Sequence, residues 1–309
     1  MPVSPTKPTA AEGPTVPPRA IILLILMTLV WGTNWPLFSY ALHEVSVWTF
    51  RTISLPVTGL VLLSVAASRG QSLRIPRASW ITVAGVCFFY QVIWNVATPL
   101  SASLIASGQS AVLGFSMPIW VALLSGVILK ERITFRVLCA VLLGATGIIM
   151  LMVPSFDAYA QAPLGVGLGL LAGFGWAIGT IILKKNPVPV PPLVLVGWLM
   201  LLTSVPVSIG AALTAQGPWF VPSWQSIAAI AYISLIPMTI GNLCWFSIVT
   251  LLPANIAGIS TIMVPVVAML SGAVIHGEPL GWIQLSALMC SVTAMALVLI
   301  RKAPGVASD

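Results

Sequence analysis

The chain has 309 residues, of which 59% are hydrophobic and only 6% are Asp, Glu, Lys or Arg. Soluble domains carry about 25% charged residues, so this chain cannot cover itself with a water-facing surface and is expected to lie in a lipid bilayer. Its net charge of +7 comes from Lys and Arg residues in short breaks between apolar runs, which is typical of a membrane protein and does not predict a nucleic-acid partner.

Residues 1–19 are rich in Pro, Thr and Ala and predict a disordered cytoplasmic tail without a cleavable signal. Apolar runs of roughly 20 residues follow, which is the length needed to cross a bilayer as a helix. The spans are expected at 20–40, 46–67, 79–98, 102–129, 135–153, 163–183, 193–214, 225–249, 253–275 and 280–300. This predicts an all-α integral membrane protein of ten helices, with 20–153 as a first five-helix unit, 163–300 as a second, and 301–309 as a cytoplasmic tail.

The basic residues orient these spans. With the N-terminus in the cytoplasm, twelve of the thirteen Lys and Arg residues fall on the cytoplasmic side, and Arg51 is the exception. An even number of spans returns the C-terminus to the same side. The pattern therefore predicts a multi-pass protein of the bacterial inner (plasma) membrane with both termini in the cytoplasm.

The two units repeat each other. Pro118 lies thirteen residues before Glu131, and Pro265 lies thirteen residues before Glu278. Three tryptophan pairs follow the same order: Trp31 with Trp176, Trp48 with Trp198, and Trp94 with Trp245. Because each unit has an odd number of spans, the second is expected to be inserted upside down. Inverted repeats recur in transporters, where exchange between their conformations opens a central site to either side of the membrane.

Several segments carry a family resemblance: LVWGTNWPLF in the first span, WTFRTISLPVTG in the second, the Pro-to-KER segment closing the fourth, and LLGATGIIML in the fifth. Over 20–300 the chain resembles the drug/metabolite transporter superfamily, in particular its ten-span EamA-type members. Within that group it is most similar to the YddG-type exporters of aromatic amino acids and related metabolites. Leu201 stands where the repeat would place a partner for Arg51, and HGEP replaces KER, so the two units are not expected to be functionally equivalent.

A substrate site is expected near the middle of the membrane, between the two units. Amide side chains within the spans should avoid lipid, and several of them adjoin aromatic residues. The candidate substrate-binding residues are Asn34, Trp35, Tyr90, Trp94, Asn95, Trp176, Asn242 and Trp245. The alternatives are an interhelical hydrogen bond of about 1 kcal/mol for each amide and core packing for each tryptophan.

Two further features remain open from the sequence. Pro118 and Pro265 occupy matching positions and are candidate hinges, although each could be a simple packing kink. Arg51 lies near the outer end of the second span, where its side chain could extend to the membrane surface or point inward toward a carboxylate or a helix C-terminus. The sequence supports a structural role for it at least as well as a substrate role.

The chemistry that is missing narrows the function. The middle of the expected spans contains no Asp or Glu, which disfavours a cation site, and no set of Lys and Arg residues, which disfavours a phosphate-ester carrier. A small neutral or zwitterionic solute is therefore expected, moved by alternating access, with amino acids first and drugs or nucleosides as alternatives. An intramembrane enzyme is disfavoured, because GxSxG and HExxH are absent and the two histidines, His43 and His276, lie near span ends. The four cysteines form no pair in a loop, and neither a metal nor a cofactor is expected. A monomer is expected, with dimerisation through Gly-rich helix faces as an alternative.

Overall fold

The computed structural model describes residues 16–105, 107–153, 156–214, 222–276 and 281–299. Throughout these residues the regular secondary structure is helical, and they form no strand. Within the described ranges, eight helices are long and apolar enough to cross a membrane, and two shorter apolar stretches occur at Pro18–Asn34 and Trp282–Val298. The chain is therefore an all-helical protein with several membrane-spanning helices, as the composition predicts.

The described residues of the first half form nine helical segments, which the sequence groups into five spans. They are α1 (Pro18–Glu44), α2 (Val47–Ser68), a 3₁₀ turn (Arg77–Ser79), α3 (Trp80–Val86), a π-helical segment (Cys87–Val92), α4 (Ile93–Leu104), α5 (Ser107–Gly114), α6 (Met117–Ile128) and α7 (Phe135–Met152). Local sequence fixes several ends: the Ser46 side chain accepts from the Thr49 N–H and starts α2, and Thr134 does the same for α7. The short helix α8 (Phe156–Gln161) follows.

Apart from the 3₁₀ turn, the described residues of the second half have the same order of elements. They are α9 (Pro163–Lys185), α10 (Pro192–Thr214), α11 (Trp224–Leu235), a π-helical segment (Pro237–Gly241), α12 (Asn242–Leu251), α13 (Ala254–Ser260), α14 (Met263–His276) and α15 (Trp282–Leu299). The link between α12 and α13 is short, because α12 ends at Leu251 and α13 begins at Ala254.

Both halves interrupt their third and fourth spans at corresponding places. A π-helical segment divides α3 from α4 and, in the second half, α11 from α12. The fourth span of each half is broken just before its proline: Phe115 and Ser116 separate α5 from α6, and Thr261 and Ile262 separate α13 from α14. Proline has no N–H to donate and is tolerated in the first turn of a helix, so the prolines begin second helices and do not bend continuous ones.

One expected boundary was wrong. The third span was predicted to end at residue 98 and the fourth to begin at 102, but α4 continues to Leu104. Pro99 lies inside α4, where packing against α9 supports the helix. Ser101 Oγ donates to the Gly165 carbonyl at 2.7 Å, and Gly169 leaves room for Ser101 on the same face. Tertiary contact has therefore overridden the usual breaking effect of proline.

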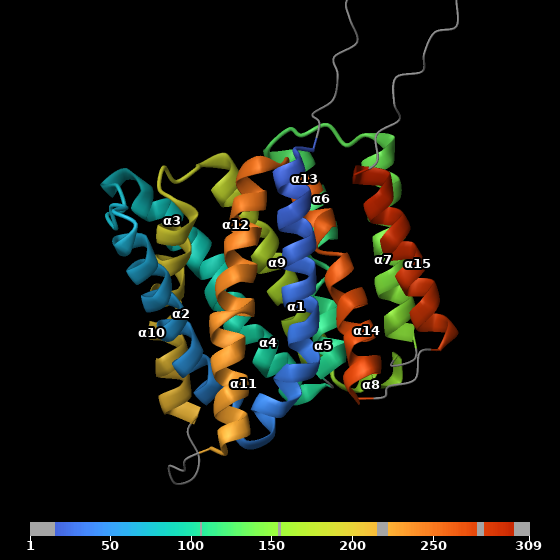
Figure 1. The fold of residues 1–309 in the computed structure, drawn as a ribbon. Coiled ribbons are helices and arrows are strands. Elements are labelled where there is room, and N and C mark those ends of the chain that lie inside the picture. The colour runs from blue at the N-terminus through green and yellow to red at the C-terminus, as the bar shows by residue number, and fades with distance from the viewer. Residues whose placement is uncertain (1–15, 106, 154–155, 215–221, 277–280, 300–309) are drawn as a thin grey trace, which may run out of the picture.

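The helices pack mainly in pairs drawn from different halves (Figure 1): α2 with α10, α4 with α9, α1 with α14, and α7 with α15. The pair α2 and α10 lies at one end of the molecule and the pair α7 and α15 at the other, with α1, α4 and α9 between them. A Cβ on Gly59 would lie 2.9 Å from the Gly197 carbonyl oxygen, so α2 and α10 can approach closely only with glycine there. The start of α1 and the end of α15 lie on the same side of the bundle.

On that same side, a carboxylate joins the two halves. Glu131 follows α6, and its Oε1 accepts a hydrogen bond from the Ala254 N–H at 2.8 Å. Its Oε2 accepts from the Asn255 N–H at 3.1 Å, so both oxygens bind the first turn of α13. The expected symmetric position of Glu278 lies outside the described residues. Glu131 therefore holds the end of the fourth span against the start of the ninth.

Candidate functional site

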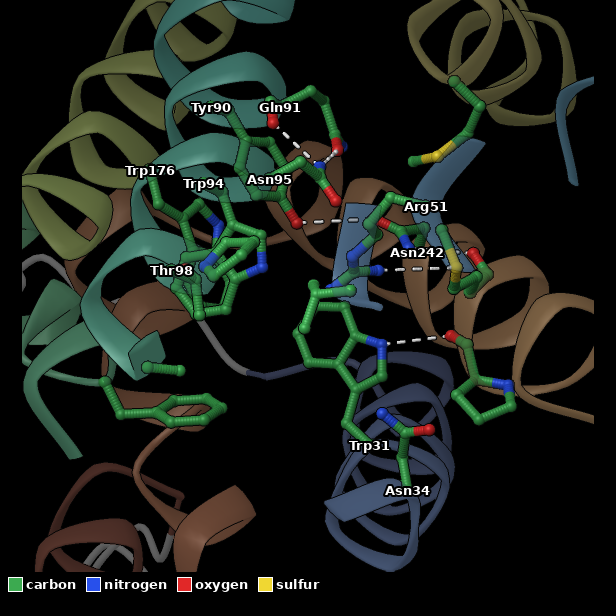
Figure 2. Close-up of a pocket in the computed structure, with 17 residues that line it drawn as sticks. Trp31, Asn34, Arg51, Tyr90, Gln91, Trp94, Asn95, Thr98, Trp176 and Asn242 are labelled. Carbon is green, nitrogen blue, oxygen red and sulfur yellow. Dashed lines mark hydrogen bonds between the residues drawn. The ribbon is translucent and has the colours of Figure 1, made fainter. Parts of the chain in front are cut away.

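A cavity of about 130 Å³ lies among helices of both halves. This is room for one small organic solute, since a buried water needs only about 10–15 Å³ by the same measure. Figure 2 shows side chains from α1, α2, α4 and α9 and from the Pro237–Asn242 segment turned toward it. The lining residues are Trp31, Asn34, Val47, Arg51, Tyr90, Gln91, Trp94, Asn95, Thr98, Pro99, Ala102, Phe115, Trp176, Met200, Pro237, Met238 and Asn242.

The cavity reaches from the middle of the bundle toward one end. Val47 and Arg51 lie at the start of α2, and Ala102 lies near the end of α4. These positions are on the side opposite to the start of α1 and the end of α15. The contact between Glu131 and α13 lies on the other side, so the cavity extends away from the point where that carboxylate joins the halves.

Trp176 is the centre of the aromatic wall. Its side chain is 2% exposed, and its ring stacks on Tyr90 with centroids 5.3 Å apart and planes 5° apart. Trp94 and Trp31 meet it edge to face, at 5.1 Å and 5.6 Å. Stacked and edge-to-face pairs are the favoured aromatic geometries, and each adds about 0.5–1.5 kcal/mol beyond its buried area. The wall is rigid and apolar, which suits a planar or apolar part of a solute.

Polar atoms interrupt this wall. Five side-chain atoms that line the cavity are buried and have no hydrogen-bond partner among the described residues: Asn34 Oδ1, Gln91 Nε2, Asn95 Oδ1, Thr98 Oγ1 and Trp176 Nε1. Leaving such an atom unsatisfied costs about 1–3 kcal/mol. A concentration of these atoms around one cavity is therefore explained by a polar occupant, either water or a solute.

Other polar groups of the cavity are already paired. Tyr90 Oη donates to Asn242 Oδ1 at 3.4 Å, and Asn242 Nδ2 donates to the Met238 carbonyl at 2.8 Å. Trp31 Nε1 donates to the Pro237 carbonyl at 3.1 Å. Both acceptor carbonyls belong to the π-helical segment Pro237–Gly241, and such segments are frequent at functional sites. The irregular backbone thereby holds two side chains of the cavity wall in place, the indole of Trp31 and the amide of Asn242.

The side chain of Arg51, whose direction the sequence left open, lines the cavity. Its Nη1 lies 3.6 Å from Met238 Sδ, and its Cζ lies 5.3 Å from the centroid of the Phe50 ring. Of the described lining residues, Arg51 is the one that carries a formal charge. The site thus combines an aromatic wall, several neutral polar groups and one guanidinium.

The structure brings together most of the predicted site residues. Six line the cavity: Asn34, Tyr90, Trp94, Asn95, Trp176 and Asn242. Trp245 lies behind the wall, 1% exposed, with its ring 5.1 Å from Trp176. Trp35 belongs to α1, but its side chain lies outside the described part of the chain.

The two candidate hinges lie elsewhere. Pro118 is buried in the first turn of α6, and a Cβ on Gly258 of α13 would lie 3.6 Å from the Pro118 Cα. Pro265 lines a second, smaller pocket of about 20 Å³ between α7, α14 and α15. Both prolines therefore lie next to the breaks in their spans. Neither of them is among the described residues that line the main cavity.

Two polar lining residues of the third span, Gln91 and Thr98, were not among the predicted substrate-binding residues, although Gln91 was expected to face the protein interior or a watery cavity. Gln91 and Thr98 flank Trp94 and Asn95 at helical spacing, so all four share one face. That periodicity was present in the sequence and would have identified them. Met200 and Met238 were not detectable in this way, because neither is polar and neither belongs to an aromatic cluster.

The model of the EamA-like transporter family matches residues 18–153 and again 163–300. The chain is 25% identical over 280 residues to the uncharacterized transporter YvbV of Bacillus subtilis, with 91% of each chain covered. It is 22% identical over 274 residues to an Escherichia coli protein named "Probable amino-acid metabolite efflux pump", covering 85% of this chain and 89% of that one. These matches point to a transporter and away from an enzyme.

A solved structure shares the fold. It superposes with a TM-score of 0.75, and the alignment covers 90% of this chain and 96% of the other. The sequence identity is 16%, so the likeness concerns the arrangement of helices alone.

Proposed function

We propose that this chain, which belongs to the EamA-like transporter family, exports small neutral or zwitterionic metabolites, including aromatic amino acids. The observation that carries the proposal is the cavity itself, in which an aromatic wall around Trp176 is combined with buried polar atoms that have no partner in the described chain. An aromatic amino acid has the matching parts, because its ring can stack while its polar end satisfies those atoms. The name of the Escherichia coli relative supports the same class of solute.

The proposed architecture is ten spans in two inverted five-helix repeats, 20–153 and 163–300, in a bacterial inner membrane with both termini in the cytoplasm. Matching interruptions in the third and fourth spans of each half support a repeat. In the proposed cycle the cavity opens alternately to the two sides, with the breaks beside Pro118 and Pro265 as hinges. The transporting unit is a monomer.

The function is tested by transport into liposomes that contain the purified protein. The panel is a set of amino acids, nucleosides and cationic drugs, each offered as a labelled solute. We expect selective flux of amino acids with aromatic or apolar side chains. Flux of nucleosides or cationic drugs in their place would assign another solute class, and no selective flux at all would contradict the proposal.

The position of the site is tested by two truncations in the third span, Trp94→Ala and Asn95→Ala. Both residues line the cavity, and Asn95 Oδ1 is one of the unpaired acceptors. We expect each variant to fold and to transport at least about tenfold more slowly, as for the loss of one good polar or aromatic contact. If both variants transport like the wild type, the solute binds elsewhere.

A further inference from the structure

We propose that Arg51 binds a carboxylate of the transported solute, so that a free carboxylate is required of every good substrate. This inference rests on the proposed function, because it assumes that the cavity holds the solute during transport. It narrows the substrate class to organic carboxylates such as α-amino acids and excludes nucleosides, amines and cationic drugs.

The first argument is the placement of the guanidinium. Arg51 lies near the start of α2, and Figure 2 shows its side chain turned into the cavity, toward Asn242. Its Nη1 meets Met238 Sδ at 3.6 Å, and a thioether is only a weak acceptor. A guanidinium carries five N–H donors in a planar fork that fits the two oxygens of a carboxylate. A carboxylate in the cavity can therefore bind this group through two parallel, charge-assisted hydrogen bonds.

The second argument is the charge of the cavity. Its described lining residues contain no Asp or Glu, so Arg51 makes the wall positive. Most of the wall is aromatic and aliphatic, and an apolar surrounding strengthens the attraction of the guanidinium for an anionic group. The same field opposes the entry of a cation. A transporter for amines would instead be expected to place a carboxylate there.

The third argument is the asymmetry between the halves. Leu201 of α10 corresponds by sequence to Arg51, and its side chain packs at the crossing of α10 with α2, where a Cβ on Gly59 would lie 2.8 Å from Leu201 Cγ. The second half therefore brings an apolar contact where the first half brings a charge. A cavity with its charge on one side can hold an anionic group at one end of the solute only.

The cavity also contains acceptors for the ammonium group of such a solute. Asn34 Oδ1 and Asn95 Oδ1 line the same cavity as acceptors without a partner among the described residues. Neutral amide oxygens can accept from the α-ammonium of an amino acid. An amino acid thus supplies an anion for Arg51, donors for the two amides, and, where aromatic, a ring for the wall around Trp176.

The experiment uses the full-length wild-type chain in liposomes and four related competitors against labelled phenylalanine. These are phenylalanine, phenylalaninamide without the carboxylate charge, phenethylamine without the carboxyl group, and 3-phenylpropionate without the ammonium. We expect the amide and the amine to compete at least about tenfold more weakly than phenylalanine, because a charge-assisted hydrogen bond is lost. Equal competition by phenylalanine and phenylalaninamide would overturn the inference without any variant.

A second measurement locates the carboxylate requirement at Arg51. In Arg51→Gln the ratio between phenylalanine and phenylalaninamide should fall to about one, while Arg51→Lys should keep part of it because the charge remains. Arg69→Gln is the matched control, since Arg69 is an exposed basic residue just after α2. An Arg51→Gln protein that retains the wild-type ratio would overturn the inference.

These outcomes separate the inference from the proposed function. Flux of amino acids with equal acceptance of the amide would leave the function standing and remove the role of Arg51. Absence of amino-acid flux, combined with binding of 3-phenylpropionate that depends on Arg51 and shifts the thermal unfolding temperature, would remove the function and keep the carboxylate site. If neither amino-acid flux nor Arg51-dependent binding of 3-phenylpropionate is found, both the proposed function and the inference are overturned.

Discussion

The third spans of the two halves both contain a π-helical segment, but the amide side chains beside these segments make different contacts. The spacing that relates Trp94 to Trp245 also relates Gln91 to Asn242. Gln91 lies in the π-helical segment of the first half, and Asn242 directly follows that of the second. Both amides line the cavity, yet Gln91 Nε2 has no described partner, whereas Asn242 binds Tyr90 and the Met238 carbonyl.

This difference teaches that a repeated backbone does not impose a repeated function. The same spacing places Tyr90 opposite Gly241, a large side chain in one half against none in the other. Tyr90 stacks on Trp176, while Gly241 makes room for Trp31. The second-half span is therefore fixed by the Asn242 hydrogen bonds and by the close packing of Trp31 on Gly241. The first-half span turns toward the cavity three polar atoms that have no partner among the described residues, Gln91 Nε2, Asn95 Oδ1 and Thr98 Oγ1.

Trp176→Ala should have the largest effect, because Trp176 joins the two third spans. Its ring contacts Tyr90 and Trp94 of the first half and Trp245 of the second. We expect a loss of about 3–5 kcal/mol in the free energy of unfolding, as for other buried tryptophans. The measurement is thermal unfolding of the purified protein in detergent.

Trp224→Ala is the control for that substitution, since Trp224 is 74% exposed in this structure. It should change the unfolding temperature little. If Trp176→Ala is no less stable than this control, the aromatic centre does not hold the two spans together.

Gly241→Ala should come next. A new Cβ would overlap the Trp31 indole, which is rigid and held by its hydrogen bond to the Pro237 carbonyl. We expect a loss of about 1–3 kcal/mol from overpacking, again measured by thermal unfolding. Gly167→Ala is the matched control, because a Cβ there meets no atom within 4 Å, and it should be neutral or slightly stabilising. Equal behaviour of the two variants would contradict the close fit of Trp31 on Gly241.

The smallest changes in stability are expected for the two corresponding amides, and they test the comparison of the third spans most directly. Asn242→Leu leaves the Tyr90 hydroxyl without its acceptor and should cost about 1 kcal/mol of stability. Gln91→Leu removes an amide whose Nε2 has no described partner and whose Oε1 accepts only a long hydrogen bond of 3.4 Å from Asn95 Nδ2. Because Asn95 Nδ2 keeps its 2.8 Å bond to the residue-91 carbonyl, stability should change by less than about 0.5 kcal/mol.

Transport should follow a different order from stability. Gln91→Leu should reduce flux of labelled phenylalanine into liposomes, because one polar contact to the solute is lost. Unfolding and flux are measured on the same preparations. A Gln91→Leu protein with wild-type flux and clearly lower stability would reverse the roles assigned to the two amides.

Much of the site followed from the sequence because its members are chemically unusual in a membrane. An amide within an apolar run must find a polar neighbour, and adjacent tryptophans indicate where an aromatic wall can form. This reasoning identified Asn34, Asn95 and Asn242 among others, and all three line the cavity. Trp245 packs behind the wall against Trp176, because one turn of helix decides whether an indole faces the cavity or the packing behind it.

The sequence by itself determined the class of environment, the approximate helices and their pairing into two similar sets. These features follow from the composition of the chain and from the spacing of residues along and between its apolar runs. The tertiary structure alone decided that the third spans contain π-helical segments, that Pro99 does not end α4, and that Arg51 points inward. The physical reason is that each of these depends on which helix lies opposite: α9 supports α4, Trp31 binds the opened turn at Pro237, and Met238 meets the guanidinium.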